Sequence, residues 1–319
     1  MSGINIIQGV DKVPTSSYVN SHYFCDYIEL LALLNNTDIV SFADVYDRFL
    51  KDGKIVEIGT EESAETNDTW ESRISEWFEL LSIREIEFGD FYPFLISGDK
   101  IRLKKEMDSP KNAYIFLLLS SNGKYIKDKN LLTTDFEIFS YEVLKSYLPS
   151  FAQIFQFGKS NISHDRYTGH ITEKINTLAT DLKCNTTYKS HFFSSTNTGD
   201  GGLDIVAWVP FENDVNQCNI QVYLGQCATG KDWLDKQDDT HKFPHKYIKF
   251  DGHINYIMFI PYDGRDTDRN FIEEKDMGDY LFFDRYRLLK TLDNYNLVES
   301  LPSFDEIVQK VIDFEEDII

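Results

Sequence analysis

Asp204 and Gln226 are the two side chains whose type and position in the sequence best suit the binding of a metal ion. Gly199-Asp200-Gly201-Gly202 precedes Asp204, and glycine takes backbone angles closed to other residues, so a tight turn should deliver Asp204 to the start of a strand. Gln226 stands near the end of the next strand-like run. Because the runs 203–211 and 220–227 follow each other across a turn-rich segment, we expect them to lie adjacent and to place Asp204 beside Gln226.

This pair offers hard oxygen ligands. A carboxylate oxygen, an amide oxygen and a nearby backbone carbonyl suit Mg²⁺, or Mn²⁺ in its place, with water and a substrate phosphate at the remaining positions. One further acid would complete such a site. The plain alternative is that the glycines form only a hairpin turn and that Asp204 makes local hydrogen bonds at a strand start.

The segments GDGGLDIVAW (199–208) and VYLGQCATG (222–230) carry a family resemblance. They resemble the core of Mrr-like restriction endonucleases within the PD-(D/E)xK nuclease superfamily, and the likeness covers roughly residues 171–262. The resemblance implies a restriction-endonuclease-like αβββαβ core and a magnesium-dependent DNA endonuclease. It also implies a role in restriction or antiphage defence.

The resemblance assigns roles to individual residues. The helix expected at 171–182 supplies Glu173 as the acid, and Glu173, Asp204 and Gln226 together hold the metal ion. The family pattern ends in Gln-x-Lys, but Ala228 stands at the lysine position here. Lys231 is the nearest replacement, and on this interpretation it orients or helps to deprotonate the attacking water.

The charge distribution bears on a DNA partner. The formal net charge of −21 argues against tight nonspecific DNA binding by the isolated chain. Lysines nevertheless gather just after the candidate site, while much of the acid lies in 61–68 and 313–317. We expect Lys236, Lys242 and Lys246 to contact DNA; the alternative is a solvated basic face. A protein partner or a homo-oligomer would also accommodate the acidic surface.

The sequence of the N-terminal half predicts helices and one β-hairpin. Helices are expected at 21–35, after an N-cap at Ser41, and from about residue 69, whereas the acidic stretch 57–69 reads as a loop or linker. A hairpin is expected at 92–105. Its second strand alternates Lys100, Arg102 and Lys104 with apolar residues, so Arg102 and Lys104 are candidate phosphate contacts in a winged-helix-like module. An exposed amphipathic strand is the alternative.

The stretch 158–169 is the expected domain boundary. It separates a mostly helical domain at 1–160, with a recognition, regulatory or assembly role, from a nuclease domain with C-terminal helices at 161–319. The fold class is α/β, or α+β overall. Helices are also expected at 136–147, 230–242, 277–292 and 303–314, and a buried strand at 254–261.

Composition narrows the setting. The sequence shows no secretory signal and no apolar run long enough to span a bilayer, so a cytoplasmic protein without membrane contact is predicted. The four cysteines are scattered, which indicates neither a zinc cluster nor a disulfide framework, and Cys227 is interpreted as a small buried filler.

Three functions remain open on the sequence. The first is a magnesium-dependent DNA endonuclease. The second, favoured by Ala228 and the acidic composition, is a catalytically degenerate nuclease-fold subunit that binds nucleic acid or a protein partner. The third is a repressor-like DNA reader that uses the N-terminal hairpin.

Overall fold

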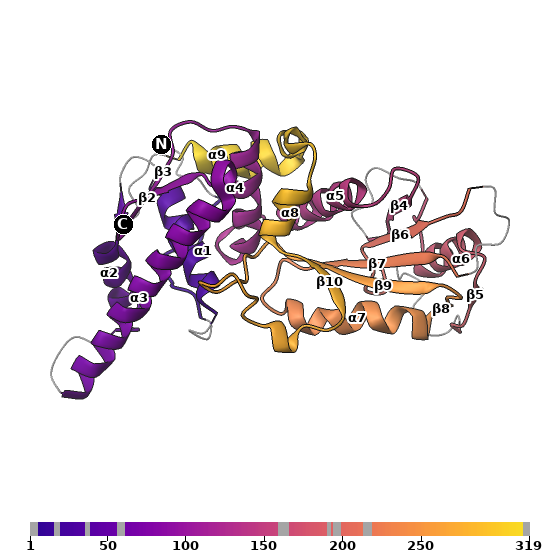
Figure 1. The fold of residues 1–319 in the computed structure, drawn as a ribbon, viewed down its shortest axis with the longest axis horizontal. Coiled ribbons are helices and arrows are strands. Elements are labelled where there is room, and N and C mark those ends of the chain that lie inside the picture. Colours follow the sequence, from indigo (N-terminus) through magenta and orange to yellow (C-terminus); the bar gives the residue numbers. More distant parts are fainter. Residues whose placement is uncertain are drawn as a thin grey trace. The chain divides into compact units, whose positions relative to one another are not determined.

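The chain folds into two compact units (Figure 1). The computed structural model describes residues 6–15, 20–35, 39–55, 61–158, 166–189, 193, 199–212 and 219–314, and for 61–67 the backbone alone. Residues 1–132, 261–274 and 295–319 make the first unit, and residues 133–260 and 275–294 make the second. The boundary expected near residue 160 lies inside the second unit, because the chain on both sides of it pairs into one sheet. Residues 159–165 are outside the described residues.

Helices and a small sheet build the first unit. β2 and β3 form the antiparallel hairpin expected at 92–105, and β1 pairs with the other side of β3. The elements are α1 (Ser21–Leu34), β1 (Val40–Ser41), α2 (Phe42–Lys51), α3 (Glu61–Phe88), η1 (Gly89–Phe91), β2 (Phe94–Ile96), β3 (Lys100–Leu103), α4 (Ser109–Ser121), η2 (Gly123–Tyr125), η5 (Tyr295–Ser300), η6 (Phe304–Val308) and α9 (Gln309–Ile312).

The start of α2 follows from its capping residues. The Ser41 side chain accepts a hydrogen bond from the Asp44 backbone N–H, and the Ser41 N–H donates to the Asp44 carboxylate at 2.7 Å. This capping box satisfies two backbone donors that a helix start otherwise leaves open. The predicted N-cap at Ser41 is therefore confirmed.

α3 begins earlier than the sequence indicated. The loop expected at 57–69 is wrong from Glu61 onward, where the backbone is already helical, while residues 56–60 are outside the described residues. Glutamate is a good helix former and is favoured near a helix N-terminus, so acidic composition alone does not exclude a helix. The apolar face predicted for this helix, with Trp70, Ile74 and Trp77, is buried.

A charged cluster lies in the core of the first unit. The Arg84 side chain is fully buried, and its guanidinium lies 2.8 Å from Asp26, 3.0 Å from Glu29 and 3.1 Å from Asp263. Tyr92 and Tyr114 each donate a hydroxyl hydrogen bond to Glu29 at 2.9 Å. Arg269 binds both oxygens of Asp263 at 2.9 Å, which adds a second cation to the cluster. Buried charges at this depth are tolerated only when they are paired and hydrogen-bonded.

A mixed five-stranded sheet with the order β10-β9-β7-β6-β4 organises the second unit. β4, β6 and β7 pair antiparallel, and β7, β9 and β10 pair parallel. Figure 1 shows α7 along one side of this sheet and α5 on the other. The elements are α5 (Lys129–Tyr147, in this unit from Thr133), β4 (Gln153–Gln156), α6 (Ile171–Asp181), β5 (Asn185–Thr186), β6 (Ile205–Val209), β7 (Gln221–Cys227), α7 (Trp233–Lys246), β8 (Ile248–Lys249), β9 (His253–Phe259), η4 (Glu274–Asp276), β10 (Tyr280–Phe283) and α8 (Arg285–Thr291).

Two expectations for the second unit need correction. The helix predicted at 277–292 is wrong in its first half, because Tyr280–Phe283 is a strand that pairs in parallel with Tyr256–Phe259. The sequence after Pro149 also carries a short helical pattern up to Phe157, and this expectation is wrong because Gln153–Gln156 is the edge strand β4. The coarse expectation of a mixed α/β protein is confirmed. None of the described helices has the length and apolar character to span a bilayer.

Candidate active site

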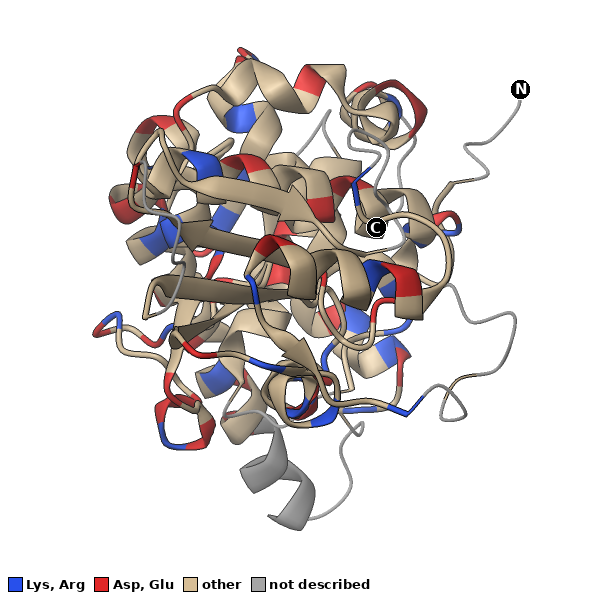
Figure 2. Ribbon diagram, turned by 90° about the vertical axis from the view of Figure 1, so that its right-hand side faces the viewer, with Lys and Arg blue, Asp and Glu red and all other residues tan. Residues whose placement is uncertain are grey.

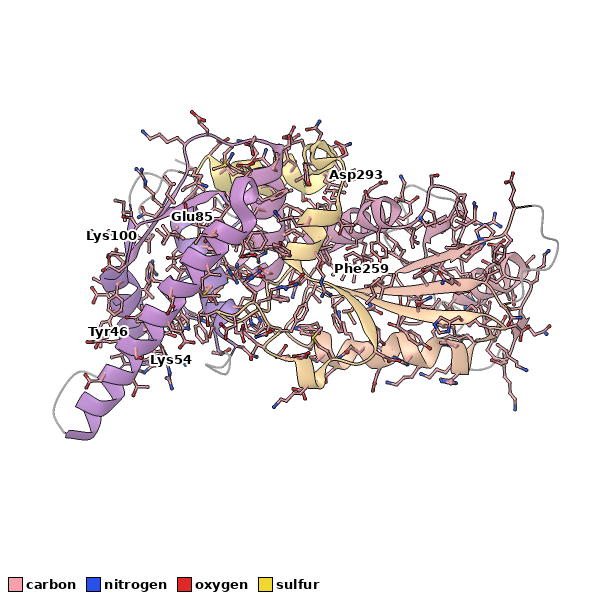
Figure 3. All side chains as sticks on the ribbon, in the orientation of Figure 1. Tyr46, Lys54, Glu85, Lys100, Phe259 and Asp293 are labelled. Carbon is pink, nitrogen blue, oxygen red and sulfur yellow. The ribbon has the colours of Figure 1, made fainter. Side chains whose placement is uncertain are left out.

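Asp204 and Gln226 lie side by side at one end of the sheet. Ile205 pairs with Gly225, and the Asp204 N–H donates to the Gly225 carbonyl at 2.9 Å, which fixes the register of β6 against β7. The Gln226 side-chain Nε2 donates to Asp204 Oδ2 at 2.8 Å, and the Cys227 N–H donates to the same oxygen at 2.7 Å. Phe259, labelled in Figure 3, pairs with Cys227 from β9. The predicted adjacency of Asp204 and Gln226 is confirmed.

A second carboxylate approaches Asp204 from α5. A Cβ built on Gly158 would lie 2.9 Å from Glu137 Oε2 and 3.3 Å from Asp204 Oδ1. The two oxygens therefore face the same small space beside Gly158, which has no side chain to fill it. The Phe157 and Gly158 N–H groups both donate to the Asp204 carbonyl, at 2.7 and 3.1 Å, and hold the end of β4 against this point.

The environment of Asp204 disfavours its charged form. The side chain is buried, and burial, reinforced by the negative charges of Glu137 and Asp200, raises the pKa of Asp204 well above the ordinary value. The hydrogen bond from Cys227 and the charge of Lys236 act in the opposite direction and are outweighed. Strongly perturbed acids of this kind concentrate at functional sites. A cation placed between Glu137 and Asp204 would relieve the repulsion.

The donor set fits a hard cation. Gln226 is 8% exposed, and its Oε1 is buried without a hydrogen-bond partner, because Nε2 is the atom turned toward Asp204. Buried polar atoms are rarely left unsatisfied, so this oxygen is available to a ligand. Glu137, Asp204 and Gln226 offer three oxygens of the type that Mg²⁺ takes. Among the residues that the structure describes, no group of three or more His, Cys, Asp or Glu side chains is placed to hold a metal ion.

The glycine turn positions Asp204 by close approach to α7. Gly202 has a φ of +87°, and a Cβ there would lie 2.7 Å from the Asp239 Cβ. Gly201 has a φ of +70°, and a Cβ there would lie 3.0 Å from the Tyr247 ring. The turn therefore requires glycine at both positions for space as well as for backbone angle.

We expect Gly202→Ala to destabilise the protein by about 2 kcal/mol, because it adds a side chain at positive φ and against α7. It should also lower any activity of the site, since Asp204 follows two residues later. Gly264→Ala is the matched control: its Cβ would meet nothing within 4 Å, and its effect should stay within about 0.5 kcal/mol. Denaturant unfolding measures both, and equal effects of the two substitutions would contradict the close-approach explanation.

Glu173 occupies a different environment from the one the resemblance implied. It lies in the first turn of α6 and is exposed, and its carboxylate accepts a hydrogen bond from the His170 N–H at 2.9 Å. It thus caps its own helix, and the acid found beside Asp204 is Glu137. Ala228 is buried at the end of β7, and Lys231 is exposed in the turn before α7.

The lysines expected to contact DNA are spread over both units. Lys242 and Lys246 are exposed on α7, and Lys242 lies 3.6 Å from Asp238. Lys236 is half-buried on the same helix. In the first unit Arg102 is exposed on β3, whereas the Lys104 ammonium donates to the Tyr92 carbonyl at 2.8 Å and supports the hairpin. Figure 2 shows lysine and arginine interspersed with acidic residues over the elements in that view.

Sequence reasoning expected the helix at 136–147 that carries Glu137, but it did not connect this residue with Asp204 because it missed β4, the strand that pairs with β6. The short run Gln-Ile-Phe-Gln follows Pro149 and precedes Gly158, and these breakers on both sides suit a strand. With that strand recognised, the helix expected at 136–147 directly precedes the first strand of the sheet. The signal for β4 was present in the sequence but occupies only four residues.

The chain was compared with family models, curated proteins and solved structures. No family model matches it, and neither a curated protein nor a solved structure does.

Proposed function

We propose that this protein is a metal-dependent endonuclease that hydrolyses phosphodiester bonds in DNA. The observation that carries the proposal is the meeting of two carboxylates, Glu137 and Asp204, with the unpartnered amide oxygen of Gln226 at the end of a mixed sheet. A setting in restriction or antiphage defence follows from the family resemblance of the segments 199–208 and 222–230.

Each residue of the site has a distinct task. Glu137 and Asp204 supply negative charge, and Gln226 supplies a neutral oxygen, so together they would hold Mg²⁺ or Mn²⁺. When bound, such an ion activates a water and neutralises charge that builds on the phosphate. Gln226 Nε2 and the Cys227 N–H fix the Asp204 carboxylate, so one of its oxygens is oriented by the strand end and the other faces Glu137.

The order of elements supports the proposal. α5, β4, β6, β7, α7 and β9 follow one another as helix, three strands, helix and strand, with α6 and the short β5 and β8 as additions. This order is compatible with the αβββαβ core that the resemblance implies if α5 takes the place that the sequence interpretation gave to the helix at 171–182, and β10 and α8 then follow as further elements. Glu137 lies on α5, Asp204 directly precedes β6, and Gln226 lies on β7.

A catalytically degenerate subunit is the second candidate. Ala228 at the lysine position favours it, because a hydrolytic site without a nearby cation loses electrostatic stabilisation of the transition state. Such a subunit would retain the fold and bind nucleic acid or a protein partner. Metal-dependent cleavage distinguishes the two functions.

Glu137→Gln and Glu173→Gln test which acid serves the site. Glu137→Gln should lower cleavage of plasmid DNA in Mg²⁺ or Mn²⁺ by about 100-fold or more and weaken Mn²⁺ binding about tenfold, because it removes one of two charges from the ligand set. Glu173→Gln makes the same chemical change at a helix cap and should leave both within about threefold.

The outcomes separate cleanly. Loss of cleavage in Glu173→Gln with retention in Glu137→Gln would restore the sequence-based assignment. Wild-type protein that neither binds Mn²⁺ nor cuts DNA would overturn the endonuclease proposal and leave the binding subunit.

A further inference from the structure

Ala228 stands where the family pattern has a lysine, and the helix α7 packs against the glycine turn 199–202. A lysine that takes over this role can therefore be sought on α7. Gly201 lies against Phe243 and Tyr247 of this region, and Gly202 lies against Asp239. From Gly201 to Gly202 the chain comes one residue closer to Asp204, and the residue of α7 that it contacts changes from Phe243 to Asp239. This contact is one helical turn closer to the start of α7. The next residue in that direction on the same side is Lys236, three positions before Asp239.

The neighbouring side chains of α7 point elsewhere. The Gln237 side chain accepts from the Gly278 N–H at 2.8 Å and donates to the Leu234 carbonyl at 3.0 Å, so it faces the segment before β10. Trp233 packs on Phe282 of β10. Lys236 therefore belongs to the side of α7 that meets the turn, and it is half-buried there.

Electrostatics agree with this placement. The positive charge of Lys236 lowers the pKa of both Asp204 and Cys227, against the larger effects of burial that raise them. These two residues lie at adjacent strand ends, and the same cation acts on both. Lys236 is thus a charge that acts on both Asp204 and Cys227.

The other nearby lysines are placed less well. The Lys174 side chain is 3% exposed and donates to the Phe157 carbonyl at 3.2 Å, so its ammonium supports the end of β4. Lys231 is exposed in the turn before α7. Lys242 lies near Asp238 and Asp239 on the solvent side of α7.

We propose that the Lys236 ammonium is the cationic catalytic group of this site and that it binds a non-bridging oxygen of the scissile phosphate. The assignment rests on the proposed phosphodiester hydrolysis and replaces Lys231 in that role. In the reaction, a water oxygen forms a bond to phosphorus, the bond from phosphorus to the leaving oxygen breaks, and the proton released from water passes through solvent to the leaving oxygen. Lys236 stays protonated throughout and stabilises the negative charge on the phosphate.

The test combines cleavage with cation binding in the full-length protein. We expect Lys236→Met to lower single-turnover cleavage of a DNA duplex by about 100- to 1,000-fold, the effect of removing one transition-state donor. Its Mn²⁺ affinity should be unchanged or several-fold tighter, because a positive charge near the two carboxylates is gone. A residue with only a structural role would not lower cleavage while sparing or improving cation binding. Lys236→Arg should recover part of the cleavage.

Lys145→Met is the matched control, because Lys145 is an exposed lysine of α5 that pairs with Glu142, and it should stay within about threefold of wild type in both measurements. Wild-type cleavage with an equally active Lys236→Met would overturn the assignment of Lys236 and leave the endonuclease proposal standing. Loss of cleavage in Lys231→Met alone would return the role to Lys231. A wild-type protein that binds no Mn²⁺ and cuts no DNA would overturn both proposals. A Lys236→Met protein with a lowered melting temperature and weakened Mn²⁺ binding would mark the residue as structural.

Discussion

Asp204→Asn should abolish cleavage and at the same time make the protein more stable at neutral pH. On the proposed function, cleavage should fall by about 1,000-fold or more, because the substitution removes a charge that would hold the metal ion, and such an ion is worth several kcal/mol of transition-state stabilisation. The melting temperature should rise by a few degrees, because about 1 kcal/mol shifts it by about 2–4 °C in proteins of this size. Thermal unfolding and plasmid cleavage, measured on the same preparations, check both expectations.

The stabilisation has a defined pH dependence. Because burial and the charges of Glu137 and Asp200 raise the folded-state pKa of Asp204 above its ordinary value of 3.8, the folded protein retains a proton that the unfolded chain releases between the two values. The contribution of this group is therefore fully favourable below pH 3.8 and is lost as the pH rises through the folded-state pKa. Asparagine does not titrate, so the variant should lack this loss.

Denaturant unfolding at several pH values compares the two proteins. The difference in unfolding free energy should grow in favour of Asp204→Asn as the pH rises through that window and then level off. A variant that is less stable than wild type at neutral pH would contradict the idea that Asp204 is a strained acid kept for function. Added Mg²⁺ should stabilise wild type more than the variant.

Arg84→Met should have the largest effect on stability. Removing one partner of a buried charge network typically costs about 3–5 kcal/mol, because the remaining charges stay buried and unpaired. Here Asp26 and Glu29 would lose a cation at 2.8 and 3.0 Å, and Asp263 would retain Arg269. Thermal unfolding of the full chain measures the effect, and Lys310→Met is the control, because Lys310 pairs with Glu306 at an exposed position and should shift the melting temperature by about 1 °C or less.

A double substitution tests whether Arg84 stabilises this cluster by its charge or by its packing. If Arg84 acts by neutralising Asp26, then adding Asp26→Asn to Arg84→Met should recover part of the lost stability, since the buried carboxylate is then gone. Purely additive losses would show that the arginine contributes through packing and not through charge. An Arg84→Met protein as stable as wild type would contradict the network altogether.

The sequence predicted those parts of the site that depend on neighbouring segments of chain. Asp204 and Gln226 are 22 residues apart and sit on consecutive strands, so a turn signal and two apolar runs were enough to pair them. Glu137 reaches the same point from α5, with β4 and α6 between it and β6. Only the three-dimensional packing of α5 brings it there, and no spacing rule connects it to Asp204.

The secondary-structure predictions were wrong where the local sequence suits more than one structure and the tertiary packing selects one of them. Tyr280–Phe283 continues into the amphipathic pattern of α8, but four consecutive apolar residues also suit a buried parallel strand, and pairing with β9 decides between them. Residues 61–69 look like a polar linker by composition, although their three glutamates and one alanine favour helices. In both cases local preference was ambiguous and the surrounding fold determined the outcome.

The route of the chain through the two units limits how this protein can be divided. Residues 261–274 leave the five-stranded sheet after β9, contribute Asp263 to the buried cluster of the first unit, and return to form β10. A fragment cut at any single position therefore carries away part of the other unit. Expression of residues 133–294 alone would separate Asp263 from Arg84, and expression of residues 1–132 alone would leave Arg84 without one of its three carboxylates. The two units should therefore be recombined and degraded together. Limited proteolysis should yield nicked chains whose fragments stay associated, in preference to two free domains.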